Sequence, residues 1–169
     1  MPINLFFVYH ACQNNYKFEA WPDKYVLKDI NNNFNVGAAG GGGILLDPDG
    51  QKELQYSWGL GVETNNLAEA LALWQGLQQA SHLKIPKLSV IGDSRLLIQA
   101  LASCRSLKQL KLNHLLEKIK LALSSFQSVE FYNVLRRLNE EANQAANEAV
   151  SLQKGVLKLN NEDRHASFP

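Results

Sequence analysis

The sequence predicts one α/β domain with a mixed five-stranded sheet, in which three antiparallel strands come first and helices flank the sheet. Three observations lead to this fold class. Apolar residues first alternate with a period of two and then recur with a helical period, and the segments follow in the order βββαβααβα. A chain of 169 residues, 46% of them hydrophobic, is long enough for a single core. We expect the domain at 21–154, after a flexible leader (1–20) and before a disordered tail (155–169).

The composition argues against several classes of protein. Lys and Arg number 17 and Asp and Glu 16, so the formal charge of +1 creates no overall field that attracts nucleic acid. The two cysteines cannot form a disulfide framework, no apolar run is long enough to span a membrane, and the N-terminus lacks the basic segment of a signal peptide. We therefore expect an intracellular monomer of the nucleus or cytoplasm with no membrane partner.

The first two strands are expected at 25–30 and 44–46. β-Branched and aromatic residues predict the first of them, and the Asn-rich stretch that follows favours a loop. Four consecutive glycines at 40–43 leave two interpretations open. They could form a flexible linker, or they could begin a strand that neighbouring backbone crowds; the apolar residues directly behind them favour the strand.

A turn and a third strand come next. The D-P-D-G sequence at 47–50 has Pro second and Gly fourth, which suits a type I turn. Between 53 and 60 the even positions are apolar or aromatic and the odd positions are polar or small, which is the period of a strand with one buried face.

The pattern then becomes helical. Thr64 or Asn65 can cap a helix that runs to about His82. One side of this helix carries the stripe Leu67, Leu71, Trp74 and Gln78. A neighbouring stripe consists mostly of small residues and includes Glu69, so the helix can lie close to the sheet and bring this carboxylate near the strand ends.

The rest of the domain alternates strands and helices. A short strand at 87–92 ends at Asp93, and Ser94 can cap the next helix. The further segments are helices at 95–102 and 105–125, a strand at 128–134 and a final helix at 139–153.

Three carboxylates fall at structurally related positions. Asp29 ends the first strand, Asp93 ends the fourth, and Glu69 approaches from the helix. Ligand sites in α/β sheets lie at the carboxyl ends of strands, and clustered acids favour a hard divalent cation that neutralises them. Spacing alone leaves open that these are three solvated surface carboxylates.

The residues around these acids resemble the motifs of type 1 ribonuclease H domains. The segment 64–69 reads T-N-N-L-A-E against the family's T-N-N-x-x-E, and 91–94 reads I-G-D-S against x-x-D-S. Upstream, the family's glycine-rich segment places its Asp on Asp29 and its Asn on Asn35, and 134–143 resembles V-x-R-x-x-N-x-x-A-D. The A-N-E-A sequence at 146–149 resembles plant retroelement members of the family, and the resemblance covers about 25–152.

The resemblance implies a metal-dependent endonuclease that hydrolyses the RNA strand of RNA/DNA hybrids. It implies catalytic and metal-binding roles for Asp29, Glu69, Asp93 and Asn143, with Mg²⁺, which Mn²⁺ can replace, as the cofactor. For nucleic-acid contacts it implies Asn35, Gly37, Asn66, Ser94 and Arg136. Asn66 could equally be a helix-start residue that satisfies backbone amides.

The sequence also departs from the family's pattern. The fourth acid falls on Asn143, an oxygen ligand without charge, which predicts weakened metal binding. Asn133 stands where the family often has a histidine, and Ile30, Phe34 and Val36 make the glycine-rich loop bulkier. An alternative is therefore an inactive hybrid-binding module derived from a retroelement. The basic stretch at 105–120, with a local charge of 5 − 1 = +4, could contact substrate or be an ordinary solvated face.

Overall fold

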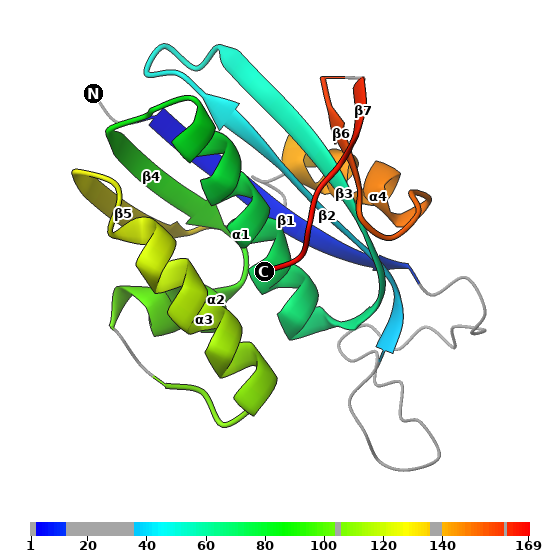
Figure 1. The fold of residues 1–169 in the computed structure, drawn as a ribbon. Helices are drawn as coiled ribbons and strands as arrows, with labels where there is room; N and C mark the ends of the chain where they lie inside the picture. The colour runs from blue at the N-terminus through cyan, green and yellow to red at the C-terminus, as the bar shows by residue number, and fades with distance from the viewer. Residues whose placement is uncertain (1–2, 13–35, 104–105, 136–139, 161) are drawn as a thin grey trace.

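A computed structural model describes residues 3–12, 36–103, 106–135, 140–160 and 162–169 (Figure 1). The strands in these ranges are β1 (Ile3–Cys12), β2 (Val36–Leu46), β3 (Lys52–Thr64), β4 (Lys87–Gly92), β5 (Ser128–Asn133), β6 (Val156–Leu159) and β7 (Glu162–His165). The helices are α1 (Asn65–His82), α2 (Arg95–Ala102), α3 (Leu110–Leu123) and α4 (Glu140–Val150). None of these helices is long and apolar enough to cross a membrane.

All the strands in the described ranges belong to one sheet, in the order β5-β4-β1-β2-β3-β6-β7. β1, β2 and β3 form antiparallel pairs, whereas β4 pairs parallel with β1 on one side and with β5 on the other. The expected mixed α/β fold with three antiparallel strands first is therefore confirmed. The sheet has more strands than the five expected, because a C-terminal hairpin extends it beyond β3.

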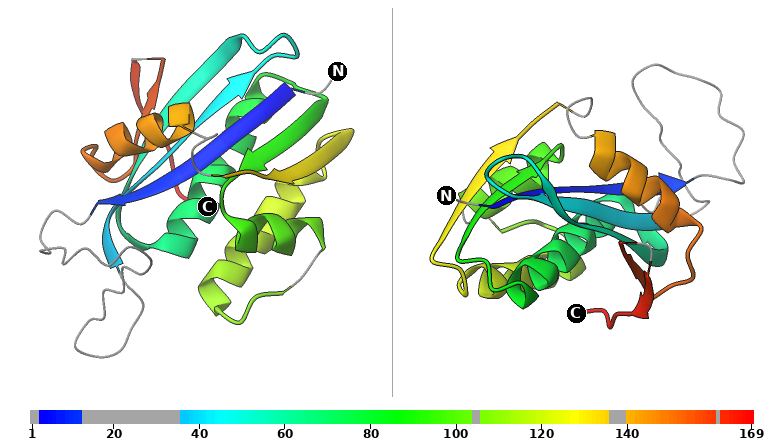
Figure 2. Two further views of the ribbon diagram at one scale, coloured as in Figure 1. Left: turned by 180° about the vertical axis from the view of Figure 1, so that it is seen from behind. Right: turned by 90° about the horizontal axis from the view of Figure 1, so that it is seen from above.

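The helices form layers on the two faces of the sheet (Figures 1 and 2). On one face, α1 packs against β1 and β2, and α3 packs behind α1. On the other face, α4 crosses β1, β2 and β3. The large core side chains lie on the α1 face, where Tyr56, Trp58 and Leu60 of β3 have no exposed surface.

The four glycines belong to β2, which decides between the two interpretations of the sequence. A Cβ at Gly40 would lie 2.5 Å from the Val150 nitrogen, and one at Gly42 would lie 2.4 Å from the Ala146 nitrogen. Real Cβ atoms do not approach backbone so closely. The glycines therefore lie within a strand, and α4 rests on Gly40 and Gly42 at backbone distance.

The N-terminal region corrects two expectations. Residues 3–12, expected to be part of a flexible leader, form the central strand β1, and the register places Phe7 beside both Gly92 of β4 and Gly43 of β2. The first strand was expected instead at 25–30, which lies outside the described residues. The physical signal for β1 was the continuous apolar run from Leu5 to Tyr9, which is typical of a strand buried on both faces and shows no alternation.

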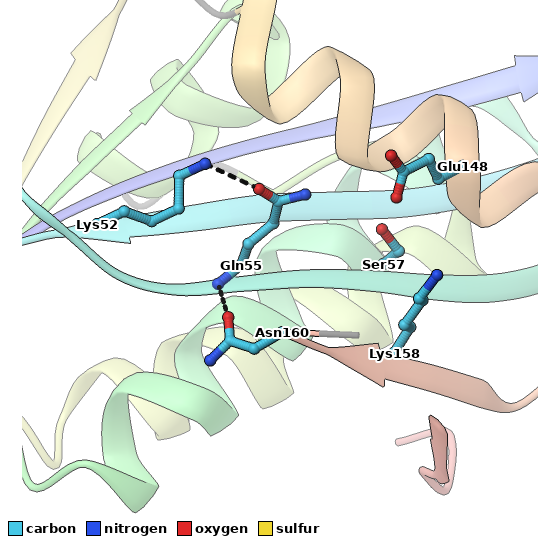
Figure 3. Close-up of a pocket in the computed structure, with 6 residues that line it drawn as sticks. All are labelled: Lys52, Gln55, Ser57, Glu148, Lys158 and Asn160. Carbon is cyan, nitrogen blue, oxygen red and sulfur yellow. Dashed lines mark hydrogen bonds between the residues drawn. The ribbon is translucent and has the colours of Figure 1, made fainter. Parts of the chain in front are cut away.

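The C-terminal segment is also ordered where a disordered tail was expected. β6 pairs antiparallel with β3, and β7 pairs with β6. Side chains reinforce the first pairing: the Gln55 amide donates to Asn160 Oδ1 at 3.0 Å, and the Asn160 amide donates to the Gln55 carbonyl at 3.1 Å (Figure 3). These contacts stabilise the added hairpin, which the chain's short apolar runs did not reveal.

Candidate active site

Glu69 lies in the second turn of α1, on the side that faces the sheet. The helix begins at Asn65 because Thr64 Oγ1 accepts a hydrogen bond from the Leu67 amide at 3.3 Å, so Thr64, not Asn65, is the cap. Ala72, three residues after Glu69 and hence on the same side of the helix, is the residue that meets Gly41 of β2. Glu69 is 9% exposed. The small-residue stripe thus positions this carboxylate against the sheet, as the sequence predicted.

Asp93 follows directly after β4, at the carboxyl end of a strand with a parallel neighbour on each side. Two hydrogen bonds hold the preceding residue: the Gly92 carbonyl accepts from the Val134 amide at 3.0 Å and from Asn133 Nδ2 at 3.1 Å. Asn133, which stands where the family often has a histidine, therefore fastens the end of β4 to the end of β5. Asp93 itself is partly exposed.

Ser94 is the N-cap of α2. Its Oγ accepts a hydrogen bond from the Leu97 amide at 3.3 Å, and its carbonyl accepts one from Ile98 at 3.0 Å. Ser94 is buried, with 8% of its surface exposed. The strand β4 therefore ends and the next helix begins within two residues, and this sharp turn presents Asp93 at the edge of the sheet.

Asn143 lies in the first part of α4 and is half-buried. The helix is held against β2 because its alanines rest on glycines, and because Ala142 and Ala146 pack with Ile44. Ser57 Oγ adds a hydrogen bond to the Ala145 carbonyl at 2.6 Å. The backbone of α4 is thus fixed on the sheet close to Asn143.

The elements that carry these three residues meet on the central strands. α1 and α4 pack on β1 and β2 from opposite faces, and β4 pairs with β1. Gly92 of β4 and Gly43 of β2 both pair with Phe7 of β1, from opposite sides. Gly42 lies against α4 at Ala146. Glu69, Asp93 and Asn143 thus belong to three elements that each contact β1, and the helices that carry Glu69 and Asn143 lie on opposite faces of the sheet (Figure 2).

The remaining predicted catalytic residue, Asp29, lies outside the described residues, as do Asn35 and Arg136. The strand next to β4 is β1, and its sequence, INLFFVYHAC, contains no carboxylate. Within the described ranges, no group of three or more His, Cys, Asp or Glu residues is arranged to hold a metal ion. The oxygen donors of Glu69, Asp93 and Asn143 suit Mg²⁺ by their chemistry, since hard cations prefer carboxylate and amide oxygens.

Two more of the predicted nucleic-acid contacts lie where β2 and β3 meet the start of α1. Gly37 belongs to β2 and pairs with Glu63 of β3. Asn66 is half-buried in the first turn of α1, two residues after the cap residue Thr64. Both positions lie at the end of the sheet where α1 begins.

Some of the cations in the basic stretch at 105–120 are held in ion pairs. Lys111 Nζ lies 3.8 Å from Glu63 Oε1, and Lys120 Nζ lies 3.1 Å from Glu117 Oε1. Arg105 lies outside the described residues, so Lys108 and Lys118 are the lysines of this stretch without an ion pair in the part of the chain that the structure describes. Of the four lysines described in this stretch, two are therefore held in ion pairs and two are not.

A polar hollow of about 220 Å³ lies elsewhere, between α4, β3 and β6 (Figure 3). It is lined by Lys52, Gln55, Ser57, Glu148, Lys158 and Asn160. Lys52 Nζ pairs with Glu141 Oε2 at 3.1 Å and donates to Gln55 Oε1 at 3.0 Å. None of the predicted site residues lines this hollow, so it is separate from the candidate active site.

Solved structures with a similar fold include several ribonucleases H. RNase H1 from the archaeon Halobacterium salinarum matches with a TM-score of 0.72 and 23% identity over 89% of this chain and 98% of that one. The N-terminal RNase H domain of Rv2228c from Mycobacterium tuberculosis matches with a TM-score of 0.72 and 22% identity over 89% of this chain and all of that one (100%). LC11-RNase H1, solved in complex with an RNA/DNA hybrid, matches with a TM-score of 0.71 and 22% identity over 88% and 96% of the two chains. The fold is thus RNase H-like.

Sequence comparison identifies the family. The reverse transcriptase-like family matches residues 29–149, and the chain belongs to it. The bifunctional protein Rv2228c of Mycobacterium tuberculosis is 30% identical over 117 residues, which are 69% of this chain and 32% of that protein. An uncharacterized protein of Mycobacterium bovis matches equally. This chain thus spans about a third of the length of these relatives, and the expected resemblance to ribonuclease H domains is confirmed.

Proposed function

We propose that this protein is a metal-dependent endonuclease that hydrolyses the RNA strand of RNA/DNA hybrids. The observation that carries the proposal is the pair Glu69 and Asp93: a carboxylate on the sheet-facing side of α1 and another at the carboxyl end of β4. Two separate motifs supply them, in the order expected of the family that matches residues 29–149. A relative with the same fold was solved with an RNA/DNA hybrid, which supports this class of substrate.

In this proposal Asp29, Glu69, Asp93 and Asn143 would hold Mg²⁺, with Asn143 contributing a neutral amide oxygen. When bound, the metal would supply a Lewis acid for water activation and leaving-group stabilisation. In the reaction, water attacks phosphorus in line as the bond to the 3′ oxygen breaks. The products are a 5′-phosphate and a 3′-hydroxyl. Glu69 and Asp93 orient their carboxylates from rigid elements, which keeps the geometry of the site constant.

Asn35, Gly37, Asn66, Ser94 and Arg136 are the proposed contacts to nucleic acid. The partly buried side chain of Asn66 and the backbone of Gly37 lie at the end of the sheet where α1 begins. Selection of RNA over DNA requires contacts to 2′-hydroxyls in the minor groove, and short polar side chains and backbone amides suit this role.

A second candidate function is a hybrid-binding module without catalysis. Two observations favour it: Asn143 replaces the fourth acid of the family, and β1, the strand beside β4, carries no carboxylate. Such a module would retain the fold and its contacts to nucleic acid while metal binding weakens. Both candidates bind hybrid, and only the nuclease cleaves it.

Cleavage of a labelled RNA/DNA hybrid by the full chain separates the two candidates. The assay is run in Mg²⁺ and then in Mn²⁺, with Asp93→Asn as the inactive variant and Asp163→Asn, an exposed acid of β7, as the matched control. We expect cleavage by the wild type and the control and a loss of at least about 10²-fold in Asp93→Asn, because a transition-state interaction is removed. Hybrid retention without cleavage in either metal would instead establish the binding module.

The replacement of Asn143 gives a more specific prediction. Asn143→Asp should raise the cleavage rate in Mg²⁺, since it restores a charged oxygen ligand. Calorimetry should show tighter Mg²⁺ binding by the same variant. An unchanged rate and an unchanged affinity for Mg²⁺ would show that position 143 is not a ligand.

A further inference from the structure

A cavity of about 640 Å³ lies between α1, α3 and the C-terminal segment, apart from the candidate active site. Its lining includes Leu67 and Leu71 of α1, Leu115 of α3, and Phe168, and it does not include Glu69, Asp93 or Asn143. This volume falls within the range of about 300–1,000 Å³ that is typical of small-molecule sites.

The floor of the cavity is apolar and well fixed. Leu67, Leu71 and Leu115 are less than a tenth exposed, because they also belong to the core. The Phe168 ring stacks on the buried Trp58 ring with centroids 4.5 Å apart and an interplanar angle of 23°. Its position is therefore set by the core, so the cavity has a rigid apolar wall on the side of the C-terminal segment.

The rim of the cavity carries charged side chains, and its lysines differ in whether they form ion pairs within the described ranges. Lys111 pairs with Glu63, and Glu117 pairs with Lys120. Lys118 and Lys154 also line the cavity, and neither forms an ion pair within the described ranges. The Lys154 ammonium lies 5.2 Å from the centre of the Phe168 ring, so one of these cations stands directly at the apolar wall.

We propose that this cavity binds a small amphipathic anion, a molecule with an apolar body and one acidic head group. The apolar body would cover Leu67, Leu71, Leu115 and Phe168, and the acidic group would face Lys118 and Lys154. Apolar lining with a few polar groups that fix orientation is the usual composition of a ligand site. The proposal does not depend on the nuclease proposal, because none of the candidate catalytic residues takes part.

Two fluorescent probes of nearly the same shape test the proposal on the full chain. Anilinonaphthalene sulfonate carries the acidic group, and N-phenylnaphthylamine lacks it. The double variant Lys118→Gln/Lys154→Gln should weaken sulfonate binding about tenfold, because each exposed charge contributes a modest share, and should change binding of the neutral probe less than about twofold. Lys108→Gln, which removes a cation that does not line the cavity, is the matched control and should bind both probes as the wild type does.

A second variant tests the location of the site. His114 lies on the exposed rim of the cavity, and His114→Trp should reduce binding of both probes by filling the space. Circular dichroism confirms that each variant is folded. Unchanged sulfonate binding in both the double variant and His114→Trp would overturn the proposal. It would also be overturned if the double variant lost hybrid binding and kept sulfonate binding, since the two lysines would then serve nucleic-acid phosphates.

Discussion

The two faces of the sheet hold their helices in different ways. On the α1 face, large side chains of β3 fill the space, and the Tyr56 hydroxyl donates to the Ala72 carbonyl at 2.6 Å. On the α4 face, glycines bring the helix down to backbone distance, and the next residue of β3, Ser57, donates to the Ala145 carbonyl at 2.6 Å. Consecutive side chains of one strand thus fasten helices on opposite faces. The difference indicates that the α1 face is a close-packed side-chain core whose side chains can adjust slightly, whereas the α4 face is a close backbone contact without room for adjustment.

The largest loss of stability should come from a change that removes the strand on which the helices of both faces pack. Deletion of residues 1–20 removes β1, which lies between β2 and β4 and on which both α1 and α4 pack. We expect the shortened chain to lose cooperative urea unfolding, measured by circular dichroism. A shortened chain that unfolds cooperatively with an unchanged midpoint would instead support the leader expected from the sequence.

The next largest loss of stability should distinguish two glycines, one from each face. Gly42→Ala places a Cβ 2.4 Å from the Ala146 nitrogen, so α4 must shift, whereas Gly41→Ala places it 3.0 Å from the Ala72 Cβ. We expect Gly42→Ala to lower the free energy of unfolding by about 3 kcal/mol and Gly41→Ala by about 1 kcal/mol. Equal losses in urea titrations of the two variants would show that the faces do not differ in rigidity.

A smaller effect should follow from removing each buried hydroxyl. Tyr56→Phe and Ser57→Ala each remove the hydroxyl that donates to a helix carbonyl, and each should cost about 1–2 kcal/mol of unfolding free energy. Hydrogen exchange should locate the loss, in α1 for Tyr56→Phe and in α4 for Ser57→Ala. Protection lost equally in both helices by both variants would contradict the separation of the faces.

The smallest effect is a pH dependence confined to the α1 face. Complete burial raises the pKa of Tyr56 far above its ordinary value of 10.0. The folded chain therefore keeps this proton when the unfolded chain releases it, so stability is fully present below pH 10 and is lost as the pH rises above it. The loss should be up to about 1.4 kcal/mol per pH unit. Tyr56→Phe should show a shallower decline above pH 10 than the wild type in chemical denaturation, and Ser57→Ala should not.

Local patterns account for the parts of the fold that were predicted correctly. The change from period two to helical period at Thr64 placed α1 at its observed bounds, since the cap residue and the apolar stripe are both local signals. Asp93 was placed at the end of β4 for the same reason, and Glu69 on the small-residue stripe. The roles of these residues in catalysis remain predictions.

The parts predicted wrongly depend on partners distant in the sequence. β1 has no alternation because both of its faces are covered, and its short apolar run is typical of a buried strand but does not show which strands lie beside it. β6 and β7 are short strands that form only because β3 offers a free edge. The positions of β1, β6 and β7 in the sheet could not be recognised without knowing which strand lies beside each of them.

The sequence by itself determined the α/β class, the order of elements from β2 to α4, and the motif positions Glu69, Asp93 and Asn143. Only the tertiary structure decided which segment occupies the centre of the sheet, that Gly40 and Gly42 of β2 leave room for α4, and that Leu67, Leu71 and Phe168 line a cavity. The physical reason is how far apart in the sequence the interacting residues lie. Caps, turns and periodicity act within a few residues, whereas strand pairing and close packing depend on segments far apart in the chain.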